Sequence, residues 1–291
     1  MKQLQGKKRF FEGWYFKNQN KEDTVCLIPG MNIEKDGISK AFIQIITADG
    51  SYNVDYPIAS FSSDKDKLEV KIGNNIFSEK GISADINDKE ITLKGNLRYE
   101  ELSPLPSDIM GPFAHLPLMQ CRHGVISMHH KVNGSLSLNG ENISFDNGFG
   151  YIEKDLGRSF PKKYFWVQCS GDADDRWGLM VSVASIPLYG IHFTGCIASL
   201  LFDQKEYRFA TYNGVKIKEI DGSGITLTRD DLILSVHIKQ NVSHRLYAPD
   251  SGHMTREIYE SLSCEANVNL FDGEKLIFSK KSNSASFEYC F

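Results

Sequence analysis

Two carboxylates in one short segment have a spacing suited to acid–base chemistry. In GYIEKDLGRSFP (150–161), an extended backbone would place Tyr151, Glu153 and Asp155 on one face. At about 3.3 Å per residue, carboxylates two residues apart lie roughly 6–7 Å from each other. In a cavity of low dielectric constant their repulsion would keep one protonated near neutral pH, as general acid catalysis requires. The same spacing also suits an exposed, charged strand end.

A third carboxylate lies among aromatic residues in RFFEGWYFK (9–17). If this segment is extended, Glu12 shares a face with Trp14, while Tyr15 points the other way. Burial would either raise the pKa of Glu12 or demand a cationic partner. Two interpretations follow: a buried acid that lines an aromatic pocket, or a structural ion pair, with Arg158 as a candidate partner.

The segment RHGVISMHHKV (122–132) adds two adjacent histidines. Strand alternation predicts that His130 faces the interior with Met128, and that His129 faces solvent. Neighbouring strand residues point to opposite sides, so this pair cannot chelate one metal ion. No other ligand spacing is present, and the sequence predicts no metal site. His130 is interpreted as a core histidine, with a proton relay as the alternative.

Alternating apolar residues predict the strands that must position these groups. The pattern recurs in LEVKI (68–72), ISADI (82–86), ITLKGNL (91–97) and ESLSCEANVNL (260–270). Asn139-Gly140 between two alternating runs predicts a hairpin, and GITLTRDDLILSVHI (224–238) predicts another. Residues 254–262 also fit a helical turn. The interrupting, proline-rich segment 103–120 is typical of a long binding loop or lid.

Many short strands joined by turns predict an all-β protein. The 291 residues hold too much strand for one small barrel, so we expect two antiparallel β-barrels or sandwiches in tandem, in domains 1–160 and 161–291. The net charge of −4, with one short basic run at GKKRF (6–10), argues against nucleic acid as a partner. No apolar run approaches the length of a spanning helix, no leader is evident and the cysteines are dispersed. A cytoplasmic protein is expected.

Three blocks of this sequence together resemble the tocopherol cyclase-like family: FEGWYFK (11–17), MGPFAHLPLMQCRHGVISMHH (110–130) and GYIEKDLGRSFPKKYFWVQC (150–169). The resemblance extends to ESLSCEANVNL and so covers nearly the whole chain. It implies a calycin-type architecture of two lipocalin-like barrels. It also implies an isomerase that protonates an alkene on a prenyl tail and lets a phenolic oxygen capture the cation, without a cofactor.

The resemblance also assigns roles to residues at matching positions. It implies that Glu12, Glu153 and Asp155 are the catalytic acids, and that four aromatic residues bind the substrate: Trp14, Tyr15, Tyr151 and Trp166. We also expect His130 to contribute to substrate binding, together with Arg158, which would hold one carboxylate ionised. Leu156 replaces the tryptophan that the family has in its EKDWG block. Because Leu156 should point away from Glu153, we interpret it as a packing residue.

Two functions therefore remain open. One is a cyclase acting on an isoprenoid phenol or quinol. The other is non-catalytic binding or transport of a hydrophobic ligand, which calycin folds often support. An enzyme needs Glu153 or Asp155 inside a closed pocket, whereas a carrier needs only an apolar cavity. Transient contact with a membrane is compatible with both, and the sequence does not determine the substrate or the oligomeric state.

Overall fold

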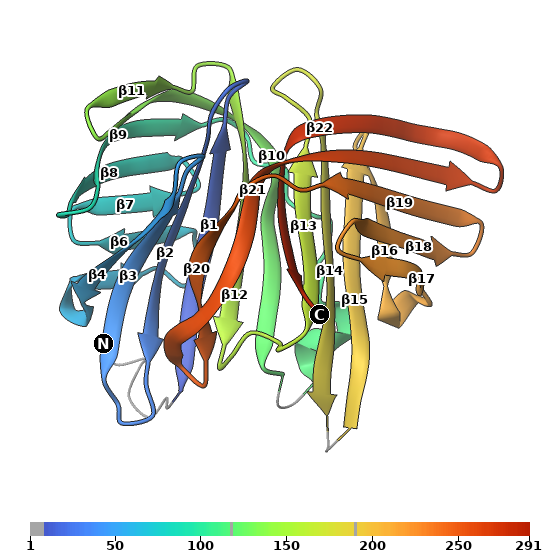
Figure 1. The fold of residues 1–291 in the computed structure, drawn as a ribbon, viewed down its shortest axis with the longest axis horizontal. Helices are drawn as coiled ribbons and strands as arrows, with labels where there is room; N and C mark the ends of the chain where they lie inside the picture. Colours follow the sequence, from blue (N-terminus) through green and yellow to red (C-terminus); the bar gives the residue numbers. More distant parts are fainter. Residues whose placement is uncertain (1–8, 117–118, 189–190) are drawn as a thin grey trace. The chain divides into compact units, whose positions relative to one another are not determined.

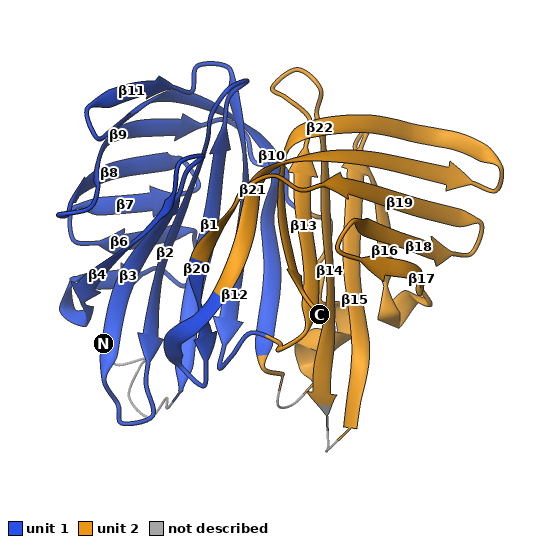
Figure 2. Cartoon of the chain, viewed as in Figure 1, with its two compact units in different colours: residues 1–104, 121–160, 246–257 blue, residues 105–120, 161–245, 258–291 orange. Residues whose placement is uncertain are grey.

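A computed structural model describes residues 9–116, 119–188 and 191–291, and its elements are almost all antiparallel strands (Figure 1). Residues 6–8 of the basic run lie outside the described residues. The chain divides into two compact units (Figure 2). Unit 1 comprises Met1–Pro104, Cys121–Phe160 and Leu246–Glu257; unit 2 comprises Leu105–Gln120, Pro161–Arg245 and Ile258–Phe291. The chain therefore passes between the units several times. No helix within the described residues is long and apolar enough to cross a membrane.

Unit 1 is built on one sheet of twelve strands. Their order is β4 (Ser51–Pro57), β3 (Ser39–Ile46), β2 (Thr24–Ile33), β1 (Phe10–Gln19), β12 (Gly148–Gly157), β10 (Cys121–Leu138), β9 (Thr92–Tyr99), β8 (Gly81–Asn87), β7 (Asn75–Ser78), β6 (Glu69–Ile72) and β5 (Phe61–Ser63), with β11 (Glu141–Ser144) beside β10 and the 3-10 helix η1 (Ile58–Ser60) after β4. Strand β10 pairs with β12 along its first part and with β9 along its last part. It therefore joins two groups of strands that run in different directions in Figure 1.

The sheet of unit 1 encloses an apolar core. Strand alternation predicted its members correctly on β6, β8 and β9, where the inward residues are fully or almost fully buried: Val70, Ile72, Ile82, Ala84, Ile86, Leu93 and Leu97. Strands β1 and β12 supply Phe16 and Ile152 to the same cluster. Because successive strand residues alternate, the odd-numbered residues of β1 and β12 lie on the other face of the sheet.

Both predicted hairpins are confirmed, and the helical turn that residues 254–262 also fitted does not form. Asn139 and Gly140 have φ angles of 50° and 91° and connect β10 to β11, as a two-residue turn requires. The segment 224–238 forms β18 (Gly224–Arg229) and β19 (Leu232–Lys239), which pair with each other. Residues 254–262 are part of one continuous strand, β21 (His253–Asp272), in which exposed and less exposed residues alternate from Thr255 to Glu260.

Unit 2 repeats the connectivity of unit 1 with fewer strands. The order in its sheet is β16 (Lys205–Ala210), β15 (Ile191–Phe202), β14 (Trp177–Leu188), β13 (Tyr164–Ser170), β22 (Lys275–Cys290), β21, β19, β18 and β17 (Lys216–Asp221), with β20 (Ser243–Asp250) beside β21. Residues Leu246–Glu257, in β20 and the start of β21, are assigned to unit 1. In each sheet the first four strands of the chain form a meander. The strand that comes last in the chain then lies next to the first strand of this meander. Strands β13, β22 and β21 thus hold the places that β1, β12 and β10 hold in unit 1.

The proline-rich segment 103–120 is mostly assigned to unit 2, and its residues 117 and 118 lie outside the described part. It contains the 3-10 helix η2 (Gly111–His115). The Arg208 guanidinium donates to the backbone oxygens of Ser107 and Asp108, at 2.8 and 2.9 Å. Tyr212, in the 3-10 helix η3 (Thr211–Asn213), donates its hydroxyl proton to the carbonyl of Ile109. These bonds fix the first half of the segment to unit 2.

Candidate functional site

The structure contains the strand face that the sequence predicted for the segment 150–161. Strand β12 lies between β1 and β10 in the sheet of unit 1. Its residues Tyr151, Glu153 and Asp155 share one face, while Ile152 joins the apolar core on the other. Leu156 falls on the core-side face, so the prediction that it points away from Glu153 is confirmed.

Tyr151 and Glu153 form a buried hydrogen-bonded pair. The Tyr151 hydroxyl donates to Glu153 Oε2 at 2.6 Å, and the two residues are 0% and 5% exposed. Burial, followed by the negative charge of Glu153, raises the pKa of Tyr151 well above its usual value. The phenol therefore keeps its proton and acts as a donor to the carboxylate across the whole physiological pH range.

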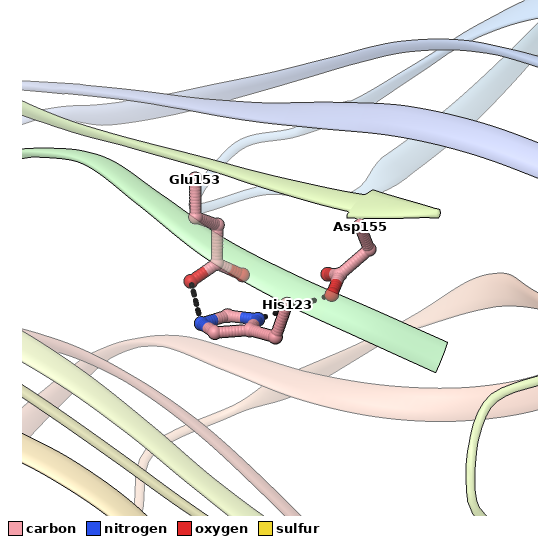
Figure 3. A group of neighbouring side chains, drawn as sticks. All are labelled: His123, Glu153 and Asp155. Carbon is pink, nitrogen blue, oxygen red and sulfur yellow. Dashed lines mark hydrogen bonds and ion pairs between the residues drawn. The ribbon is translucent and has the colours of Figure 1, made fainter. Parts of the chain in front are cut away.

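His123 completes the group and was missed by the sequence analysis. It lies on β10 directly opposite Asp155. Its Nδ1 is 3.0 Å from Asp155 Oδ1 and its Nε2 is 3.5 Å from Glu153 Oε2, so one imidazole lies between two carboxylates (Figure 3). Nothing in the spacing of RHG (122–124) indicates this role, because it arises from the register of β10 against β12.

The three side chains have the donor set of a metal site as well as of a proton network. One ligand atom from each of His123, Glu153 and Asp155 lies within 4.8 Å of the others. Imidazole and carboxylate ligands suit divalent transition metals. The same contacts allow the imidazole to take a proton from one carboxyl group and pass it to the other. The geometry is compatible with both uses.

Other polar side chains line the same face of the sheet. Tyr15 on β1 is directly opposite Glu153, and its ring centroid is 6.5 Å from that of Tyr151. Cys26 on β2 donates its thiol proton to the Tyr15 hydroxyl at 3.0 Å. Cys121 lies 3.5 Å from Asp155 Oδ1, and burial raises the pKa of its thiol well above the usual value. This second thiol is therefore protonated and unreactive as a nucleophile.

Glu12, Trp14 and Arg158 are not part of this group. Glu12 forms an ion pair with Lys154 at 2.6 Å, and the Lys154 ammonium lies 4.6 Å from the centre of the Trp14 ring. Glu12, Trp14 and Lys154 are on the core-side face, because even-numbered residues of β1 and β12 point there. The structural ion pair that the sequence suggested thus exists, but its cation is Lys154. Arg158 follows the end of β12 and is exposed.

The two adjacent histidines do not follow simple alternation. The register of β10 against β12 shifts between Val125 and Ser127 and again before His130. His129 is 2% exposed, so its predicted solvent position is wrong. His130 is fully buried in the interior, as predicted, and on the core side its Nδ1 is 3.0 Å from Ser127 Oγ and its ring 4.4 Å from that of Tyr99.

Burial also fixes the charge of His130. Its pKa is lowered to about 3, chiefly by desolvation and further by His129. The imidazole is therefore neutral at physiological pH. This supports the interpretation of His130 as a core residue. Gly150 makes room for it, because a Cβ at that position would lie 2.5 Å from His130 Nε2.

Trp166 belongs to unit 2, where a second tyrosine–glutamate pair occurs. It lies on β13, on the face opposite the apolar cluster that holds Phe165 and Val167. Trp166 is directly opposite Glu288 on β22, and the Tyr164 hydroxyl donates to Glu288. Strands β13 and β22 are the counterparts of β1 and β12. A ligand role for Trp166 stays a prediction.

Comparison with known proteins identifies the family to which this sequence is similar. A sequence model described as tocopherol cyclase-like matches residues 90–289. A chloroplastic protein of rice, described as a probable tocopherol cyclase, is 32% identical over 94 residues, which are 28% of this chain and 18% of that protein. The chloroplastic tocopherol cyclase of maize is 27% identical over 114 residues, 35% of this chain and 23% of that one. The matches thus span about a fifth of these curated relatives.

Two crystal structures share the fold over almost the whole chain. One, described as AttH from Nitrosomonas europaea, has a TM-score of 0.56 and 12% identity, covering 97% of this chain and 93% of that one. The other, kievitone hydratase from Nectria haematococca, has a TM-score of 0.55 and 11% identity, covering 96% and 88%. The expected fold class, two lipocalin-like antiparallel β units in tandem, is confirmed.

Proposed function

Because this chain belongs to the tocopherol cyclase-like family, we propose that it protonates an isoprenoid alkene and closes a ring on a prenylated phenol or quinol. The observation that carries the proposal is the hydrogen-bonded group of Tyr151, Glu153, His123 and Asp155 on one face of the unit 1 sheet. Such a group can hold a proton, release it and stabilise the charge left behind, which is what this reaction demands.

Glu153 is the proposed acid. In its neutral form it transfers a proton to one alkene carbon of the substrate, and a tertiary carbocation forms at the other. The carboxylate that remains accepts a hydrogen bond from Tyr151 at 2.6 Å and faces His123 Nε2 at 3.5 Å. The Tyr151 donor favours the charged form, so it stabilises the product of the transfer and lowers its barrier.

His123 and Asp155 then return the proton. The phenolic oxygen of the substrate attacks the cation and forms the new C–O bond, and its proton is lost. His123 can accept that proton while Asp155 holds the imidazolium through Nδ1 at 3.0 Å, and can then reprotonate Glu153. The overall reaction is an isomerisation, because one proton is delivered and one is recovered.

Aromatic rings on this face support the cation. Tyr15 and Tyr151 are 8% and 0% exposed, and their rings meet edge to face at 6.5 Å between centroids. The electron-rich face of a phenol attracts a nearby cation by about 0.5–2 kcal/mol. Trp14 is on the core-side face and has no part in this proposal.

Incubation with a prenylated quinol in D₂O tests the proposal. A cyclase gives an isomeric chromanol that is one mass unit heavier than the substrate, because the carbon that Glu153 protonates carries one non-exchangeable deuterium. A product heavier by one water would mean that water captures the cation; the likeness to a hydratase makes this the outcome to check. Unchanged substrate that still binds tightly to Glu153→Gln would instead favour the alternative function, non-catalytic binding of a hydrophobic ligand.

A further inference from the structure

The imidazole between the two carboxylates of β12 has a possible ligand that the mechanism above does not use. His123 is opposite Asp155 in the register of β10 against β12, and Glu153 is one same-face step away on β12. Among the residues that the structure describes, these three form the only group of histidine, cysteine or acidic side chains close enough to share a metal ion. The sequence predicted no metal site, because only the register of the two strands assembles this group.

The contact between His123 and Glu153 has the dimensions of a chelate. Their Nε2 and Oε2 atoms are 3.5 Å apart. This is longer than an ordinary N–H···O hydrogen bond of about 2.7–3.2 Å. Two ligands that bind one tetrahedral ion at about 2.1 Å each are about 3.4 Å from one another. An ion can therefore bind to both atoms with little movement of either side chain.

The neighbours of the two ligands hold them as the outer contacts of a metal site do. Asp155 Oδ1 is 3.0 Å from Nδ1 of His123, so the ring keeps its Nε2 toward Glu153 (Figure 3). A carboxylate commonly orients a metal-binding histidine through its second nitrogen. Tyr151 donates to Glu153 Oε2 at 2.6 Å and so orients that carboxylate. The two ligand atoms are thus fixed before an ion arrives.

The group is partly open to solvent, and its ligand types select one class of ion. The side chains of His123 and Asp155 are 12% and 18% exposed, and that of Glu153 is 6% exposed. An imidazole nitrogen beside a carboxylate oxygen suits Zn²⁺, Co²⁺ or Ni²⁺, whereas Mg²⁺ and Ca²⁺ prefer oxygen ligands alone. Two protein ligands are fewer than the three or four of a resident zinc site, so we expect the ion to exchange with solvent.

We propose that His123 and Glu153 reversibly bind a divalent transition-metal ion, such as Zn²⁺ or Co²⁺, and that this ion inhibits the proposed cyclisation. The ion takes the nitrogen and oxygen atoms between which the mechanism moves its proton. Glu153 cannot deliver a proton to the alkene while it ligates a metal. The inhibition rests on the proposed function, but the binding of the ion does not.

Titration of the metal-free protein with Co²⁺ tests the binding without any substrate. The visible d–d absorption of protein-bound Co²⁺ should saturate at one ion per chain. Glu153→Gln replaces a charged ligand with a neutral amide of the same shape, so the dissociation constant should rise by about a hundredfold or more. Asp155→Asn should raise it by about ten- to a hundredfold, as expected for an outer-contact residue. If circular dichroism shows that one variant does not fold, the other decides.

His253→Gln is the matched control. His253 Nδ1 is 3.2 Å from Glu34 Oε2, so this pair also combines an imidazole with a carboxylate in unit 1, but its histidine side chain is 37% exposed. The variant should keep the wild-type dissociation constant. The proposal is overturned if Co²⁺ does not bind saturably, or if Glu153→Gln and Asp155→Asn bind it as wild type does. A strong sulfur-to-cobalt charge-transfer band would also overturn it, because the ion would then lie on a cysteine.

A second measurement separates the metal site from the cyclase reaction. With a prenylated quinol, saturating Zn²⁺ should abolish most of the turnover of wild type, and EDTA should restore it. Zn²⁺ is suitable here because it has no redox chemistry with the quinol. Undiminished turnover with the ion bound would refute the inhibitory role. A wild type that binds one Co²⁺ per chain, yet forms no chromanol in the absence of metal, refutes the cyclase reaction and leaves the metal site standing.

Discussion

Glu12 and Glu153 lie on neighbouring strands of one sheet but on opposite faces of it. Glu12 is opposite Leu156 and Glu153 is opposite Tyr15, so their positions differ by an odd number of residues along the ladder. Glu12 pairs with Lys154 beside Trp14, and Glu153 pairs with Tyr151 and His123. Two acids that match one family pattern therefore have separate surroundings, and we expect separate roles.

Glu12→Gln should leave catalysis nearly intact. The substitution removes an ion pair whose side chains are 20% and 29% exposed, so it should lower the free energy of unfolding by about 1 kcal/mol or less. We expect kcat/KM for the proposed cyclisation to stay within about threefold of wild type. Urea unfolding and product formation measure the two quantities. A loss of activity in a folded variant would restore Glu12 as a catalytic acid.

Glu153→Gln should lower kcat more than Asp155→Asn does. The first removes the proposed proton donor and should lower kcat by about 10²–10⁴-fold. The second keeps the donor but leaves His123 without its anionic partner, so we expect a smaller loss, about tenfold to a hundredfold. Single-turnover kinetics with a prenylated quinol distinguish them. The reverse order would transfer the role of acid to Asp155.

Tyr151→Phe should slow the reaction. It removes the 2.6 Å hydrogen bond that stabilises the Glu153 carboxylate after proton transfer. Loss of such a donor costs about 10²-fold or more in kcat in other enzymes. Tyr99→Phe is the control, because the Tyr99 hydroxyl donates to Asn18 on the core side of the same sheet. Equal losses in the two variants would mean that the effect is structural.

Chelation should not affect the proposed activity. The mechanism uses a proton held among His123, Glu153 and Asp155, although their ligand atoms lie within 4.8 Å and have the chemistry to bind a divalent metal. Dialysis against EDTA should leave kcat unchanged, and elemental analysis should find no stoichiometric metal. If activity disappears and returns with one added metal ion, a metal-bound water replaces Glu153 as the proposed acid.

His130 should make the fold less stable in acid. Its pKa is about 3 in the folded chain and 6.5 when unperturbed, so between these values the unfolded chain binds a proton that the folded chain does not. The contribution of neutral His130 to the free energy of unfolding is therefore fully present above pH 6.5, and it decreases as the pH drops toward 3. At pH 5 the loss from this residue is about 2 kcal/mol.

Urea unfolding at pH 7.5 and pH 5 measures this effect. The difference in unfolding free energy between the two pH values should be smaller in His130→Gln than in wild type by that amount. His237→Gln, at an exposed position of β19, should behave as wild type. An identical pH dependence in all three proteins would contradict the burial of a neutral His130.

Local patterns were sufficient to predict much of the molecule. Alternation identified the core residues of β6, β8 and β9, and Asn139-Gly140 identified its hairpin, because both depend on short-range backbone geometry. The common face of Tyr151, Glu153 and Asp155 followed from the same rule. The rule failed at His129, because register shifts in β10 break the alternation there.

By itself, the sequence determined the all-β class, the family and the face on which Tyr151 and Glu153 lie. Only the tertiary structure decided which residues join them. His123 is 30 positions before Glu153 and Tyr15 is 138 positions before it, and each is placed by the register of a neighbouring strand. Register depends on hydrogen bonds between segments distant in sequence, and a change of one residue would move a side chain to the opposite face. The partners of an acid on a strand are therefore a property of the assembled sheet.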